Sequence, residues 1–179
     1  MQNKAENIFT HTMKTGLVLS IVLIVSEFYV FFVPNSESVG ISESLLFSGI
    51  SMVGLAAQVF CIFYFTRRYR DDVLEGNMNY MIALRYGFYM FFFAGLIFAA
   101  CVYLCNQFLG VNYVAEKGSF ALKLMKQAQY PQGDIDLWLK SLEEVKRLSA
   151  SRLAWDSLAS VMFSGVVMLL FTSIFFRKK

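Results

Sequence analysis

Hydrophobic residues gather in four long runs along the chain, about residues 14–33, 45–66, 80–109 and 157–176. A helix rises about 1.5 Å per residue, so each run can cross a hydrocarbon core of about 30 Å. A soluble core could not bury runs of this length. We therefore predict an all-α integral membrane protein with four transmembrane helices.

The polar segment between the third and fourth runs, residues 112–155, has a different pattern. Two amphipathic stretches, Tyr113–Gln129 and Ile135–Leu148, flank the turn signal Tyr130–Gly133. Apolar positions in the second stretch recur every three or four residues, which is typical of one helix face. We predict a helical hairpin on the outer side of the membrane, packed on itself. Because residues 149–156 contain no Gly or Pro, we expect its second helix to continue into the fourth span.

The charged residues indicate an orientation in the membrane. Lys4 and Lys14 precede the first run, whereas Glu37 and Glu43 follow it, so the positive-inside rule places the N-terminus in the cytoplasm. Eight Lys and Arg residues fall on that side and seven on the other, all in the long segment. We predict that both termini lie inside.

Composition agrees with a membrane protein and narrows the function. The chain is 57% hydrophobic and 16% charged, and its net charge of +3 is too modest to indicate nucleic-acid binding. Cys61, Cys101 and Cys105 all fall within predicted spans, and two thiols one turn apart do not complete a metal site. The single histidine, His11, is interpreted as a residue at the membrane interface. We expect neither a metal nor a cofactor.

Polar residues inside predicted spans are the candidate intramembrane site, because such residues are costly in lipid and often functional. Glu27 is expected to hydrogen-bond with Tyr103 or Asn106 of the third span, and the alternative is a proton or ion pathway. Arg85 is expected to extend to lipid phosphates, or to pair with Gln58 of the second span.

Small residues recur at a spacing of four within two spans. Gly95 and Ala99 do so in the third, and Ser160 and Ser164 in the fourth. Such pairs let membrane helices approach closely. We interpret both pairs as packing faces.

The segment from Arg67 to Gly87 resembles a known family. It has Arg-Tyr-Arg-Asp after the second span, a turn at Gly76, an aromatic residue at Tyr80, and Ala83 and Gly87 four apart. With four spans and a helical insertion before the last, it resembles the domain of unknown function 4199 family. The resemblance implies a small bacterial inner-membrane protein, and hints at a partner among membrane enzymes of polyprenyl-linked sugar transfer. It assigns no activity.

Three functional hypotheses follow. The first is a non-enzymatic accessory or scaffold protein that binds membrane lipids and associates with itself or another membrane protein. Its partner surface would lie on the hairpin, at Trp138, Lys140 and Leu142. The second is a small transporter or channel that uses the polar residues Glu27, Gln58 and Arg85. The third, a lipid-modifying enzyme, lacks the clustered acids or histidines that its chemistry needs.

The predicted orientation can be tested by labelling single cysteines in a variant that lacks the three native ones. Cysteines at Ser38 and Gln132 should react with an impermeant thiol reagent added outside, because both positions fall in outer segments. A cysteine at Asn77 should stay unlabelled. Labelling at position 77 without labelling at 38 would invert the topology.

Overall fold

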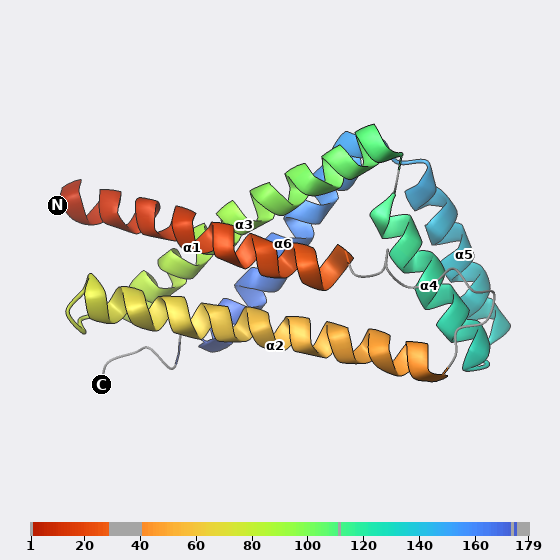
Figure 1. Ribbon diagram of the computed structural model, residues 1–179, viewed down its shortest axis with the longest axis horizontal. Helices are drawn as coiled ribbons and strands as arrows, with labels where there is room; N and C mark the ends of the chain where they lie inside the picture. The colour runs from red at the N-terminus through yellow and green to blue at the C-terminus, as the bar shows by residue number, and fades with distance from the viewer. Residues whose placement is uncertain (1, 29–40, 111, 173, 175–179) are drawn as a thin grey trace.

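The computed structural model describes residues 2–28, 41–110, 112–172 and 174, and this part of the chain is all-helical, with no strand. Four of its helices are long and apolar enough to cross a membrane, in line with the prediction. Figure 1 shows the arrangement. The helices are α1 (Gln2–Phe28), α2 (Ile41–Asp72), α3 (Tyr80–Leu109), α4 (Tyr113–Gln127), α5 (Gln132–Lys146) and α6 (Ala150–Thr172).

Helix α3 has the predicted bounds, because both of its ends are specified locally. The side chain of Asn79 accepts a hydrogen bond from the Ile82 amide at 2.8 Å, which caps the first turn. Gly110 ends the helix in the left-handed conformation with φ 64°, and its N–H bonds to the carbonyl of Cys105.

The other long helices have different bounds from those predicted. Helix α1 begins at Gln2 and α2 at Ile41, each earlier than the apolar run that it contains. A helix extends beyond its apolar run when nothing in the sequence stops it, so hydropathy alone misplaces such ends. Residues 29–33 of the first predicted span, residues 173 and 175–176 of the fourth, and Glu37 and Ser38 lie outside the described residues.

The predicted continuous helix from residue 135 into the fourth span is wrong, because α5 ends at Lys146 and α6 begins at Ala150. Ser149 starts the new helix. Its hydroxyl accepts a hydrogen bond from the Arg152 amide at 3.3 Å, and its carbonyl accepts one from Leu153 at 3.0 Å. A serine in this role favours a helix start over a helix interior.

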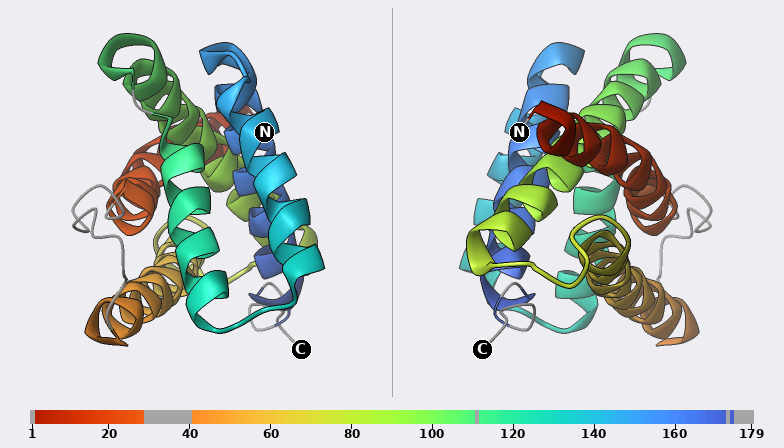
Figure 2. Two further views of the ribbon diagram at one scale, coloured as in Figure 1. Left: turned by 90° about the vertical axis from the view of Figure 1, so that its right-hand side faces the viewer. Right: turned by 90° about the vertical axis from the view of Figure 1, so that its left-hand side faces the viewer.

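Helix α3 lies at the centre and packs against α1 and α6 (Figures 1 and 2). Glycines bring the helices close together. A Cβ at Gly87 would lie 2.0 Å from the Leu169 side chain, and one at Gly165 would lie 2.5 Å from the Phe91 ring. A Cβ at Gly16 of α1 would lie 2.9 Å from a backbone carbonyl of α3. Such close approach is the usual source of packing energy between membrane helices.

A buried aromatic cluster joins α1, α2 and α3 near the α2–α3 turn. Tyr86 is fully buried and stacks on Tyr69, with ring centroids 4.5 Å apart. Its hydroxyl lies 2.9 Å from Nδ1 of His11 and 3.2 Å from Oγ1 of Thr15. His11 is therefore part of the helix packing, rather than only a residue at the membrane interface as predicted.

Helices α4 and α5 lie side by side at the opposite end of the bundle (Figure 2). The Asn112 side chain, at the start of α4, donates a hydrogen bond to the Val145 carbonyl at 3.1 Å. The indole of Trp138 donates one to the Gly118 carbonyl at 3.0 Å. Their shared apolar cluster consists of Ala115, Leu122, Ile135 and Leu142. The side of the membrane on which this pair lies stays a prediction.

The close contact between α3 and α6 predicts that Gly165→Ala lowers the thermal unfolding temperature in detergent. The added Cβ would overlap the Phe91 ring, and overpacking of this kind costs about 1–3 kcal/mol. Gly49→Ala is the matched control, because nothing lies within 4 Å of a Cβ there and the helix propensity of alanine is higher. Equal unfolding temperatures for the wild type and Gly165→Ala would show that the contact is not tight.

Candidate functional site

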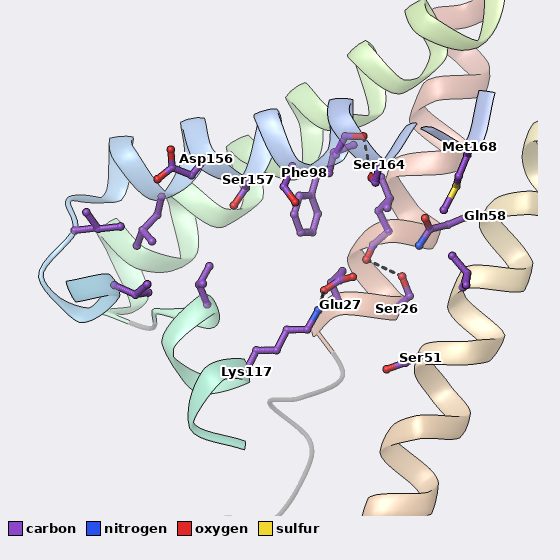
Figure 3. A pocket seen from close by; sticks show the side chains of 18 residues that line it. Ser26, Glu27, Ser51, Gln58, Phe98, Lys117, Asp156, Ser157, Ser164 and Met168 are labelled. Carbon is purple, nitrogen blue, oxygen red and sulfur yellow. Dashed lines mark hydrogen bonds and ion pairs between the residues drawn. The ribbon is translucent and has the colours of Figure 1, made fainter. Parts of the chain in front are cut away.

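A cavity of about 590 Å³ lies between α1, α2 and α6, with α4 and α5 at its end (Figure 3). Pockets that bind small molecules usually measure about 300–1,000 Å³. Half of the lining residues are polar, although most of them belong to apolar spans. The polar residues are Ser26, Glu27, Ser51, Gln58, Lys117, Asp156, Ser157, Ser160 and Ser164.

The cavity results from the way in which the helices are paired. Helix α3 packs between α1 and α6, so these two helices are not in close contact beside it. Helix α2 packs chiefly against α1. A Cβ at Gly54 of α2 would lie 2.5 Å from the Ser26 Cβ of α1, which shows how closely these two helices approach. The space between α2 and α6 therefore stays open.

Three serines of α6 form a stripe along the cavity. Ser157, Ser160 and Ser164 line it, and Ser157 is only 8% exposed. The interpretation of Ser160 and Ser164 as a packing face is wrong, because both are exposed at the cavity. Gly95 does serve packing, since a Cβ there would lie 2.9 Å from the Leu158 side chain.

Glu27 forms an ion pair with Lys117 of α4, at the end of the cavity where α1 and α4 meet (Figure 3). The predicted pairing of Glu27 with Tyr103 or Asn106 is wrong. Glu27 lies in the last turn of α1, where a negative charge is unfavourable next to the helix dipole, and the ammonium of Lys117 offsets this cost. The prediction considered only partners at the same membrane depth in the other spans. Lys117 lies outside the spans, on α4.

A second ion pair lies near the first turns of α6. The guanidinium of Arg152 lies 3.2 Å from the Asp156 carboxylate, one helical turn further on. Both side chains are largely exposed, so the pair contributes little to stability. Its position makes Asp156 the second carboxylate of the cavity wall.

The other predicted intramembrane residues are divided between two places. Gln58 lines the same cavity as Glu27. Arg85 is exposed beside an apolar groove between α3 and α6, next to Phe88 and Leu170, so the predicted pairing with Gln58 does not form. Asn106 is on α3 and is not among the residues that line the cavity.

The three candidate partner residues of α5 differ in their exposure. Leu142 is buried against α4, where its side chain contacts Gly118. Lys140 is exposed, and Trp138 is 40% exposed although its indole is hydrogen-bonded. Among the described residues, no group of three or more His, Cys, Asp or Glu side chains is placed to hold a metal ion.

Four apolar helices of spanning length define a multi-pass membrane protein. The chain belongs to the family described as Protein of unknown function (DUF4199), which it matches over residues 14–178, so the resemblance seen at Arg67–Gly87 is confirmed. No curated protein and no solved structure matches the chain. The family thus gives the class of protein, and the function has to be argued from the cavity.

The Glu27–Lys117 pair can be tested with a double-mutant cycle. Glu27→Gln and Lys117→Gln should each lower the free energy of unfolding in detergent by no more than about 1 kcal/mol, because the pair is partly exposed. The double variant should lose less than the sum of the two, and exchanging the two charges should recover part of the loss.

Lys126→Gln is the control, because Lys126 is an exposed lysine on the same helix. Strictly additive losses for the two substitutions would contradict the pairing.

Proposed function

We propose that the protein is a non-enzymatic accessory protein of the bacterial inner membrane that holds an amphiphilic molecule in the cavity between α1, α2 and α6. The observation that supports this proposal is the polar lining of a 590 Å³ cavity within helices of membrane-spanning character. Polar groups are costly next to lipid chains, so a polar wall among apolar helices points to a polar ligand. The paired carboxylates and the bonded hydroxyls keep free lone pairs, which can accept hydrogen bonds from a polar head.

The wall of the cavity suits an amphiphile because it is divided between polar and apolar side chains. Leu23, Leu55 and Phe98 line it together with the serines. Leu55 is 51% exposed, and Ser160 and Ser164 are exposed as well, so the cavity is open to the outside between α2 and α6. A lipid could enter along this opening without leaving the bilayer.

The accessory role rests on the chemistry of the cavity and on the outer face of α5. The described lining offers carboxylates, hydroxyls, one amide and one amine, and the hydroxyls of Ser26 and Ser164 donate to backbone carbonyls rather than to a base. On α5, Leu137 is 65% exposed next to Trp138 and Lys140. We propose this face as the contact with a second copy or with another membrane protein, such as a polyprenyl-linked glycosyltransferase. Both termini would lie in the cytoplasm.

A small transporter is the second candidate, because Glu27 and Gln58 line one cavity. Arg85 lies outside that cavity, and toward the α2–α3 turn the bundle is filled by buried side chains that include Ile62, Tyr69 and Tyr86. Transport would therefore need the helices to rearrange. Substrate flux into proteoliposomes that is lost in a folded Glu27→Gln variant would favour this candidate over the accessory protein.

The proposal can be tested by filling the cavity. Native mass spectrometry of the protein, extracted from membranes in mild detergent, should show a bound amphiphile. Ser160→Phe should abolish it, because the ring would occupy the cavity. Ala159→Phe adds the same bulk at the neighbouring exposed position, which does not line the cavity, and should keep the ligand. A wild-type protein without a bound amphiphile, or a Ser160→Phe variant that retains it, would refute the proposal.

A further inference from the structure

The charged groups in the cavity wall disfavour a negatively charged ligand. The described lining has two carboxylates, Glu27 and Asp156, against one ammonium, Lys117. That ammonium is already paired with Glu27. Asp156 pairs with Arg152, which does not line the cavity. An anionic headgroup would therefore approach two carboxylates without an unpaired lining cation to receive it, and like charges repel.

Two serine hydroxyls in the wall, those of Ser26 and Ser164, use their protons within their own helices. Ser26 donates its proton to the Leu23 carbonyl at 3.1 Å, and Ser164 donates its proton to the Val161 carbonyl at 3.1 Å. A serine hydroxyl has one proton and two lone pairs, so each of these oxygens presents its lone pairs to the cavity. The ionised carboxylates of Glu27 and Asp156 can only accept. The wall thus offers more acceptors than donors.

Serines of three helices face the same space in the cavity. Ser157 and Ser164 point from α6 toward the space where Ser26 of α1 and Ser51 of α2 lie (Figure 3). Ser157 and Ser164 are seven residues apart, which places them about 10 Å apart along the helix. A headgroup with several donors can reach acceptors on more than one helix.

We infer that the cavity selects an amphiphile whose headgroup donates hydrogen bonds and carries no net negative charge. This inference rests on the proposed function and names the class of ligand. Two kinds of membrane lipid have this chemistry: aminophospholipids, whose ammonium donates, and uncharged lipids with a free hydroxyl. Lipids without a donor, and anionic lipids, should be excluded.

The test measures binding of four lipids with identical acyl chains to the delipidated full-length protein by native mass spectrometry. Phosphatidylethanolamine and phosphatidylcholine differ in their donors at equal net charge, phosphatidylglycerol has donors but is anionic, and diacylglycerol has an uncharged hydroxyl. Phosphatidylethanolamine, diacylglycerol or both should bind about tenfold more tightly than the other two, the effect expected of about one hydrogen bond. Binding of only one of the favoured pair identifies the amine or the hydroxyl as the source.

Single substitutions show whether the serines cause the selectivity. Ser26→Ala and Ser164→Ala should each reduce the preference for the favoured lipid over phosphatidylcholine. Ser141→Ala is the control, because Ser141 makes the same kind of bond to its own helix, to the Leu137 carbonyl at 3.1 Å, but lies on α5 outside the cavity. Ser141→Ala should leave the preference unchanged.

Two results would overturn the inference. If phosphatidylcholine binds as tightly as phosphatidylethanolamine and diacylglycerol, the headgroup donors do not determine affinity. If phosphatidylglycerol binds most tightly, the cavity does not select against negative charge. If either result appeared while Ser160→Phe still abolished binding, the proposed function would stand and only the selectivity would fail. Absence of binding by all four lipids would refute the selectivity, and absence of a native adduct as well would refute the proposed function.

Discussion

The contact of α3 with α1 and α6 through glycines is the constraint on which the rest of the structure depends. At Gly87 and Gly165 the facing side chains occupy the space that a Cβ would take, so α3 and α6 approach as closely as their backbones allow. Gly16 does the same for α1. Helix α3 thereby packs against α1 with one face and against α6 with another. Because α3 lies between them, α1 and α6 do not pack against each other. The cavity is a consequence of this tight packing elsewhere.

The two ends of the bundle are stabilised by different interactions. Near the α2–α3 turn, Tyr86 is buried among side chains of three helices, and its hydroxyl is satisfied by His11 and Thr15. At the other end, α1 is tied to α4 by the Glu27–Lys117 pair. Aromatic stacking leaves no room for a ligand at the first end, whereas the ion pair at the second end lies at the cavity.

The sequence predicts the features that depend on neighbouring residues. The third span is located correctly because Asn79 and Gly110 mark its ends, and the all-helical class follows from hydropathy. The sequence does not predict the start of α6, because a serine in the chain does not by itself mark a helix start. The capping role of Ser149 is known only from its hydrogen bonds. The partner of Glu27 was missed because it depends on how α4 folds back over α1, a contact between residues 90 positions apart. The spacing of apolar residues along the chain contains no information on such a contact.

The hydrogen bond at the base of the α4–α5 pair separates the length of this segment from the spacing of the membrane helices. The bond from Asn112 to the Val145 carbonyl brings the beginning of α4 next to the end of α5, so the chain leaves α3 and returns toward α6 over a short distance. Length added or removed at residues 128–131 would not change the separation of α3 and α6. The tip between α4 and α5 can therefore change in length without moving the membrane helices, provided that Lys117 stays opposite Glu27.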